Sequence, residues 1–272
     1  MSGFGAARRP HLRYDAGAAA YDRFVGRWSR LYAVAVLEAA GVKGSDRVLD
    51  LATGTGDAAL LAIQQVGPYG TGIGVDLSLP MLVVAKSKSS EARLSFVAAD
   101  AQALPFRDRS FDAAICLFSL MFFPDRIGAL RGARGLLRPG GRIALSVWGP
   151  SDRAPFAGIV AEALAKELPA DRDELLRPFA LADPRVVEDL LVTAGFRDVH
   201  ITREVRQASF VSVEDFWEPI QAGGGRLGQA YLGLPSDARA RVVHDVRESA
   251  KQFNAKGQLL MDLEAYIATG AP

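Results

Sequence analysis

Short apolar runs alternate with helix-forming stretches through the first half of the chain. Helical patterns separate the runs, and the run that ends at Leu117 is apolar on both faces after Asp112, as in a central parallel strand. Strands alternating with helices at this spacing predict an α/β fold with a doubly wound, mostly parallel sheet. The five runs occupy residues 48–51, 72–76, 94–98, 111–117 and 142–148.

The flanks of this region carry other patterns. Apolar residues at helical spacing over 15–40 predict an N-terminal helical cap within residues 1–44, which covers a cofactor-binding core at 45–148. After Trp148, prolines and glycines break the alternation. We therefore expect a single domain over 1–272 with lid insertions, which would carry substrate specificity, at 149–182 and 206–257.

Strand and helix patterns also occur between and after the insertions. A helix is expected from Asp183 to Ala194, a sixth strand over 199–205 and a final strand over 259–268, which completes a seven-stranded sheet. Residues 212–254 predict two further helical stretches.

Composition narrows the classes of partner. The 272 residues include 32 basic and 31 acidic side chains, so the formal charge of +1 gives no electrostatic case for nucleic acid. The single Cys116 cannot form an internal disulfide, which suits a reducing compartment. We see neither a signal-peptide pattern nor an apolar run long enough to span a bilayer, and we expect a cytoplasmic protein.

The stretch VLDLATGTGDAAL, residues 48–60, combines a strand, a glycine loop and the start of a helix. Gly54 and Gly56 free the backbone for a tight turn, and Asp57 can cap the helix that follows. Such a turn at the carboxyl end of a parallel sheet commonly binds an adenine cofactor. The loop alone does not say which one, because nicotinamide, flavin and sulfonium cofactors all use a glycine loop.

Acidic residues in and after this loop favour a cation. The third glycine of the nicotinamide fingerprint is absent, and Asp50 and Asp57 on either side of the loop would repel a pyrophosphate but attract a sulfonium and an ammonium group. Asp76, at the end of the second strand, can accept hydrogen bonds from ribose hydroxyls. Asp100, at the end of the third strand, can accept the adenine amine beside the backbone of Ala101.

Five segments in order resemble the class I S-adenosylmethionine-dependent methyltransferases. They cover about residues 45–150, and the glycine loop, the DAQALPF stretch and LRPGG are most similar to the ubiquinone/menaquinone C-methyltransferase type. Leu117 and Met121-Phe122 stand where the quinone enzymes often have Ser and Arg-Asn, which leaves the acceptor open. The segments are VLDLATGTGD, IGVDLSLPML, FVAADAQALPF, FDAAICLFSLMFFPD and LLRPGGRIALSVWGP.

The resemblance implies S-adenosylmethionine as cofactor, a Rossmann-like methyltransferase fold and an antiparallel final strand. It also implies a role for each residue that contacts the cofactor. The loop would hold the amino-acid part, Asp76 the ribose, and the following residues the adenine, while Leu117 forms the wall near the methionine and Tyr21 covers the site from the cap. The expected cofactor contacts are Asp50, Ala52, Gly54, Thr55, Gly56, Asp76, Leu77, Met81, Asp100, Ala101, Leu117 and Tyr21. Asp50 has the alternative of simply accepting backbone donors and shaping the loop.

The substrate side carries fewer signals. We expect Phe122, Trp148 and Trp217 in an apolar substrate pocket, although core packing is the alternative for such aromatic residues. His11 is the candidate general base, because the N-terminal arm could close over the site. His200 and His244 are expected on the surface, and we expect no bound metal.

These patterns together predict a methyltransferase that acts on a small, fairly apolar molecule, and a homodimer is compatible with them. One alternative is a protein of the same fold that binds S-adenosylmethionine or S-adenosylhomocysteine without methyl transfer, as a regulator or a catalyst of another reaction. A nicotinamide oxidoreductase is a second alternative, which the acidic residues disfavour.

Overall fold

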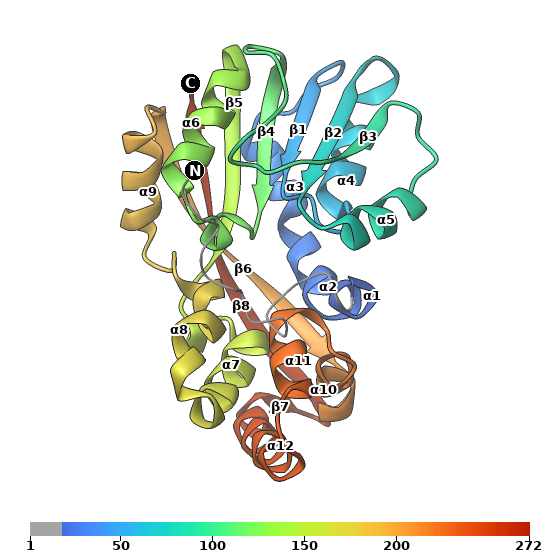
Figure 1. The fold of residues 1–272 in the computed structure, drawn as a ribbon, viewed down its shortest axis with the longest axis vertical. Coiled ribbons are helices and arrows are strands. Elements are labelled where there is room, and N and C mark those ends of the chain that lie inside the picture. Colours follow the sequence, from blue (N-terminus) through green and yellow to red (C-terminus); the bar gives the residue numbers. More distant parts are fainter. Residues whose placement is uncertain (1–17) are drawn as a thin grey trace, which may run out of the picture.

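A single mixed sheet runs through the whole molecule (Figure 1). The computed structural model describes residues 18–272. The strand order is β3-β2-β1-β4-β5-β8-β6; the first five strands are parallel, and β8 is antiparallel to both of its neighbours. This confirms the predicted doubly wound, mostly parallel sheet, to which a short β7 adds an eighth strand. The strands are β1 (Arg47–Leu51), β2 (Thr71–Asp76), β3 (Leu94–Ala98), β4 (Phe111–Leu117), β5 (Leu137–Trp148), β6 (Arg197–Phe210), β7 (Asn254–Ala255) and β8 (Gln258–Ala271).

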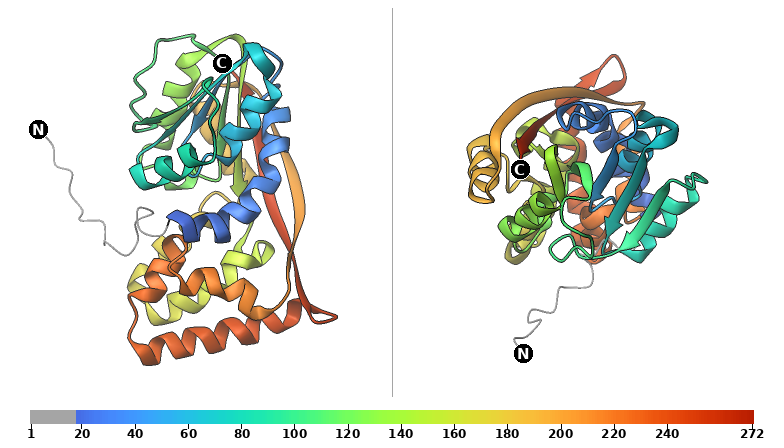
Figure 2. Two further views of the ribbon diagram at one scale, coloured as in Figure 1. Left: turned by 90° about the vertical axis from the view of Figure 1, so that its right-hand side faces the viewer. Right: turned by 90° about the horizontal axis from the view of Figure 1, so that it is seen from above.

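Helices that connect the strands cover both faces of the sheet (Figure 2). Several begin where the sequence supplies a capping side chain: Ser78 accepts a hydrogen bond at the start of α5, Asp125 at α6 and Asp183 at α9. The connecting helices are α3 (Ala33–Ala39), α4 (Asp57–Gln65), α5 (Leu79–Ser87), α6 (Arg126–Leu136) and α9 (Pro184–Thr193).

The N-terminal cap is helical over its described part. It starts with α1 (Ala18–Tyr21), passes through a π-helical turn at Asp22–Gly26, α2 (Arg27–Ser29) and a 3-10 turn at Arg30–Tyr32, and continues into α3. His11, the candidate base, lies outside the described residues.

The lid insertions form a helical half below the sheet (Figure 1). The expectation of two helical stretches over 212–254 is wrong, because Gly223-Gly224 and Leu234-Pro235 each end a helix, and two interruptions leave three helices. The helices of this half are α7 (Pro155–Glu167), α8 (Arg172–Leu175), α10 (Val213–Gln221), α11 (Gly225–Leu232) and α12 (Ser236–Ala250), with 3-10 turns at Ser151–Arg153, Pro169–Asp171, Arg177–Phe179 (η8) and Lys251–Phe253.

Strands β6 and β8 are longer than predicted and join the two halves (Figure 2). β5 pairs with β8 only up to Trp148 and Ala265, whereas β6 accompanies β8 as far as Phe210 and Leu259. The second insertion therefore begins after Phe210 and not at residue 206. Buried Ala208 and Phe210 keep the strand against the helices of the lower half, which is why it does not end at Val205.

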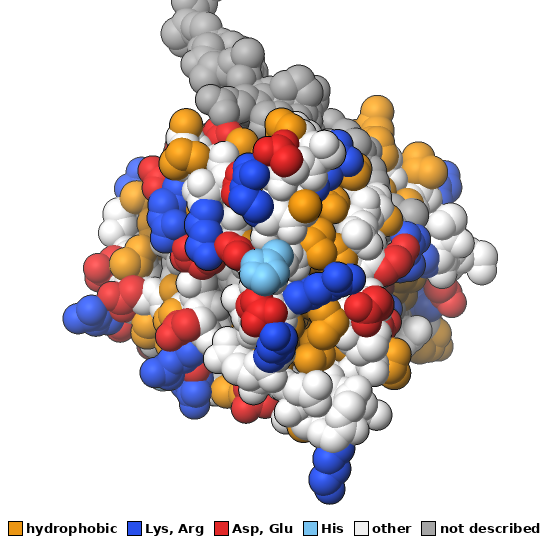
Figure 3. Space-filling model, turned by 90° about the horizontal axis from the view of Figure 1, so that it is seen from below, with side chains coloured by type: hydrophobic (Ala, Val, Ile, Leu, Met, Phe, Trp, Pro, Cys, Tyr) orange, Lys and Arg blue, Asp and Glu red, His pale blue; other side chains and the backbone are white. Residues whose placement is uncertain are grey.

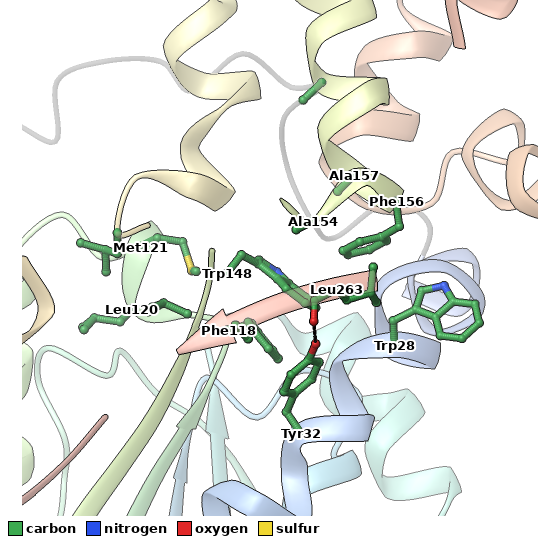
Figure 4. Close-up of a cluster of buried hydrophobic side chains, with 14 of the residues drawn as sticks. Trp28, Tyr32, Phe118, Leu120, Met121, Trp148, Ala154, Phe156, Ala157 and Leu263 are labelled. Atoms are coloured by element: carbon green, nitrogen blue, oxygen red, sulfur yellow. Dashed lines mark hydrogen bonds between the residues drawn. The ribbon is translucent and has the colours of Figure 1, made fainter. Parts of the chain in front are cut away.

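An aromatic cluster joins the cap, the sheet and the lower half (Figure 4). The rings of Phe118 and Trp148 stack with centroids 3.7 Å apart, and Tyr32 meets both edge-on. The Tyr32 hydroxyl donates a 2.5 Å hydrogen bond to the carbonyl of Leu263 on β8. The cap is thereby fixed to the strand ends on which the site is built.

Candidate cofactor and substrate site

The loop after β1 leaves open space at one glycine and none at the other. Gly54 and Gly56 both have left-handed backbones, with φ of +57° and +83°. A Cβ at Gly56 would lie 2.9 Å from the Cβ of Ala85 and 3.1 Å from the ring of Phe96, whereas a Cβ at Gly54 would meet nothing within 4 Å. Gly56 thus lets helix α4 pack closely, and Gly54 faces room in which a ligand can approach the backbone.

Asp76 meets this loop at the end of β2. Its carboxylate accepts hydrogen bonds from the backbone N–H groups of Gly54 and Ser78, each at 2.8 Å. The next residue, Leu77, is 66% exposed, which is unusual for a leucine beside a buried strand. Gly54, Asp76 and Leu77, which are all expected at the cofactor, therefore lie together, and the apolar side chain of Leu77 is uncovered.

Asp50 lies beneath the loop in the core. Its side chain is 1% exposed, and one carboxylate oxygen accepts a 2.6 Å hydrogen bond from the Thr53 hydroxyl. Burial raises the pKa of Asp50 to about 7; the charge of Asp76 adds to this rise and the Thr53 hydrogen bond opposes it. Near neutral pH Asp50 is only partly charged, and its contacts fit the alternative that it shapes the loop.

Asp57 does not face the cofactor space as a free charge, contrary to the electrostatic argument from sequence. The ammonium group of Lys88 lies 3.2 Å from Asp57 and 2.6 Å from Asp22. Asp22 also accepts a 2.7 Å hydrogen bond from the hydroxyl of Thr55. The pairing cancels much of the negative charge that a sulfonium would feel, so the case for a cation rests on Asp76 and Asp100.

The expected adenine contacts differ in exposure. Asp100 is half-buried and accepts a 2.9 Å hydrogen bond from the backbone N–H of Gln102. Ala101 and Met81 are buried, and Leu117 is half-buried at the end of β4. Contact of these four residues with a cofactor stays a prediction.

The four aromatic residues expected at the site separate into two groups. Tyr21 and Phe122 are half-buried and lie close to α11: a Cβ at Gly225 would be 3.5 Å from the Tyr21 ring, and the guanidinium of Arg226 lies 5.5 Å from the centroid of Phe122. Trp148 and Trp217 are 3% and 2% exposed. Both belong to the packed core, as the alternative interpretation had it, so their contact with substrate stays a prediction.

Two strained backbone positions at the strand ends could not be predicted from the residue types. Ala52 after β1 and Phe118 after β4 both have left-handed φ, of +52° and +49°, which is strained for residues other than glycine. The Ser119 hydroxyl donates a 3.4 Å hydrogen bond to the Ala52 carbonyl and so links the ends of these neighbouring strands. Strain of this kind is common at ligand sites, and no residue type announces it.

Three lid and core arginines were also missed. Arg126 begins α6, Arg177 begins η8 and Arg226 lies in the first turn of α11. Their spacing in the chain is irregular, so only the fold brings them together.

Charged side chains and two histidines occupy the described surface away from the loop. His200 and His244 are exposed, as predicted. Lys, Arg, Asp and Glu side chains mix on the lower face (Figure 3). On α12, Arg241 pairs with Glu167 and Asp237. Over residues 18–272 we find no cluster of potential metal ligands and no helix with the length and apolarity needed to cross a membrane.

Known proteins share this fold and this loop. Residues 48–141 match the profile of a methyltransferase domain family. A demethylmenaquinone methyltransferase from Thermus thermophilus is 38% identical over 146 residues, which cover 53% of this chain and 64% of the relative. The match thus spans less than two thirds of that relative.

Solved structures extend the likeness to the whole chain. Phosphoethanolamine N-methyltransferase 2 of Haemonchus contortus, in complex with S-adenosyl-L-methionine, superposes with a TM-score of 0.61 at 20% identity, over 99% of this chain and 61% of that one. The [4+2]-cyclase SpnF superposes with a TM-score of 0.58 at 18% identity, over 95% and 94% of the two chains.

The fold is the Rossmann-like fold of class I methyltransferases. Residues 48–141 are similar to a methyltransferase domain family, and the chain is 36–38% identical over parts of its length to demethylmenaquinone and ubiquinone/menaquinone C-methyltransferases, in agreement with the resemblance noted in the sequence.

Proposed function

We propose that the protein is an S-adenosylmethionine-dependent methyltransferase that acts on a small, fairly apolar molecule. The observation that carries the proposal is the junction of β1 and β2, where Asp76 meets the open backbone at Gly54 beside exposed Leu77. This junction occurs in the segment that matches the methyltransferase family.

The residues present fit this cofactor. The loop at Gly54 and Thr55 would hold its amino-acid part, Asp76 its ribose and Leu77 one face of its adenine. When bound, the cofactor supplies a methyl group on an already activated sulfonium. The protein then has mainly to align the acceptor in line with the methyl carbon and exclude water, and such positioning is worth about 7–11 kcal/mol.

Isothermal titration calorimetry with S-adenosylmethionine, S-adenosylhomocysteine and NAD tests the cofactor. We expect binding of the first two and none of NAD; binding of NAD alone would sink the proposal. Transfer of isotopically labelled methyl groups from the cofactor to molecules in a cell extract then identifies the acceptor.

A second candidate is a protein that binds the cofactor without transferring its methyl group. Two observations support this candidate. A protein of the same fold is named as a [4+2]-cyclase, and the described residues near β4 include no obvious general base. Binding of S-adenosylhomocysteine together with no label transfer to any extract component would favour it.

The remaining expectations concern partners and location. We propose a small-molecule acceptor, no role for nucleic acid, a cytoplasmic location and a homodimer. Light scattering coupled to size-exclusion chromatography tests the dimer.

A further inference from the structure

Three arginine side chains gather where the lid meets the carboxyl end of β4. Arg126 donates a 3.1 Å hydrogen bond to the carbonyl of Met121 in the turn after β4, and Arg226 lies over the ring of Phe122 in the same turn. Arg177 belongs to η8, which packs against this turn. The three guanidinium groups therefore come from the core and from both lid insertions.

One carboxylate serves this group among the described residues. Glu174 of α8 pairs with both Arg177 and Arg226. Arg126 has no acidic partner over residues 18–272, and burial, together with the charge of Arg177, lowers its pKa. Among the described residues, Arg126 and Arg177 place two guanidinium groups against the one carboxylate of Glu174, which leaves an excess of positive charge in a partly buried place.

Donors remain unused within this group. The Nε atoms of Arg126 and Arg177 are buried, and neither has a hydrogen-bond partner among the described residues. A guanidinium offers planar, forked donors that match the two oxygens of a carboxylate. Buried positive charge with unused donors is costly unless an anion occupies the place.

The position connects the arginines to the proposed active site. β4 is the neighbour of β1, and in open α/β sheets ligands bind outside the carboxyl ends of such strands. The hydrogen bond from Ser119 to Ala52 ties the turn after β4 to the cofactor loop. An acceptor held by the arginines would reach toward the place where the proposed cofactor presents its methyl group.

We infer that Arg126, Arg177 and Arg226 form a subsite for the carboxylate of the methyl acceptor, which makes the acceptor an apolar organic acid. The claim that the bound carboxylate belongs to a methyl acceptor rests on the proposed function. The anion subsite itself can be tested without methyl transfer.

The test compares 2-naphthoate with its neutral analogue 2-naphthamide by calorimetry on the full chain, with and without S-adenosylhomocysteine. We expect the acid to bind at least about tenfold more tightly than the amide, as charge-assisted hydrogen bonds require. Arg177→Gln should remove most of this preference. Arg172→Gln is the matched control, since Arg172 pairs with Glu162 at the exposed start of α8, and it should leave the preference unchanged.

Glu174→Gln separates a subsite from a purely structural latch. Removal of the internal carboxylate frees the Arg177 guanidinium of its acidic partner, so the affinity for 2-naphthoate should rise severalfold. Equal affinities for acid and amide in the wild type, no binding of either, or a weaker affinity in a folded Glu174→Gln variant would overturn the inference. Naphthoate binding without S-adenosylhomocysteine binding would instead overturn the proposed function and leave the subsite standing.

Discussion

Three acidic residues at the glycine loop carry separate tasks. Asp50 is buried beneath the loop, Asp57 pairs with Lys88, and Asp76 accepts a hydrogen bond from the backbone N–H of Gly54. Asp76 was predicted correctly to lie beside the loop, because the carboxyl ends of adjacent parallel strands meet at one edge of a sheet. Pairing with a distant lysine depends on how the cap and α5 pack, and local sequence does not encode it.

Replacement of Asp76 by alanine should weaken the binding of S-adenosylhomocysteine by roughly 1.5–3 kcal/mol, the contribution of a hydrogen bond to a charged group. Calorimetry measures the change, with exposed Asp108→Ala as the control. An unchanged affinity for the Asp76 variant would remove this residue from the site.

The two loop glycines should respond differently to alanine. Gly54→Ala should lower the free energy of unfolding by only about 1–2 kcal/mol, the strain of a left-handed alanine, while it abolishes tight cofactor binding. Gly56→Ala adds a clash with Ala85 and Phe96. Its free energy of unfolding, measured in urea, should therefore fall by about 1–3 kcal/mol more than that of Gly54→Ala. Equal losses for the two variants would contradict the assigned difference.

Asp50 should make stability depend on pH. Its folded pKa of about 7 lies above the ordinary 3.8, so the stability that its protonated form contributes is full below about pH 4 and is lost as the pH rises through 7. Asp50→Asn keeps the shape without titrating. The free energy of unfolding of this variant relative to wild type should therefore increase from pH 5 to pH 8 in urea titrations without cofactor, and a flat difference would argue against the raised pKa.

Elements were predicted well where their signals are local. The five parallel strands and helices α6 and α9 follow from apolar runs, capping residues and glycines that stand together in the chain. The extent of β6 and β8 was underestimated, because residues 202–207 of β6, which precede buried Ala208 and Phe210, are mostly charged or polar. Pairing with β8 and the burial of Ala208 and Phe210 keep this part of β6 extended.

Glu264 is the polar centre of this strand pair. Its buried carboxylate accepts hydrogen bonds from Arg203 on β6, at 2.5 Å and 2.8 Å, and from the hydroxyl of Tyr266 at 2.8 Å. These hydrogen bonds outweigh the effect of burial and lower the pKa of Glu264. The stability it contributes is therefore present above the ordinary glutamate pKa and is lost on acidification.

Glu264→Gln should lower the free energy of unfolding at pH 7 by roughly 1.5–3 kcal/mol, with a smaller loss at acidic pH. Asp262→Asn is the control on the same strand, because Asp262 is exposed and contacts only Gln207 among the described side chains. Thermal and urea unfolding provide the measurement; a loss that does not shrink with acid would point to packing instead of charge.

At the scale of the whole molecule, one cluster of buried side chains connects the sheet with the cap and the lower helices, and a second cluster packs α3 and α4 against the sheet. The sequence could not show that the two lid insertions meet over β4, since Arg126, Arg177 and Arg226 are brought together only by the fold. The single-domain organisation stays a prediction.

If the chain is a single domain, the sheet and the lower helices should unfold together. Far-ultraviolet circular dichroism and the fluorescence of Trp217 in the lower half, in a variant with Trp28 and Trp148 replaced by Phe, should give coincident urea transitions. Two separated transitions would assign independent stability to the lower half.

The pairing of β6 with β8 also bears on how such proteins diversify. Phe210 and Leu259 are register partners at the end of this pairing, so the chain leaves the sheet and returns to it at neighbouring points. The segment between them could be exchanged for that of a relative without moving the ends apart, provided that its helices still pack against α7. The β6–β8 pair is thus a suitable boundary for recombination. A recombined protein could bind a new acceptor while its cofactor loop stays unchanged.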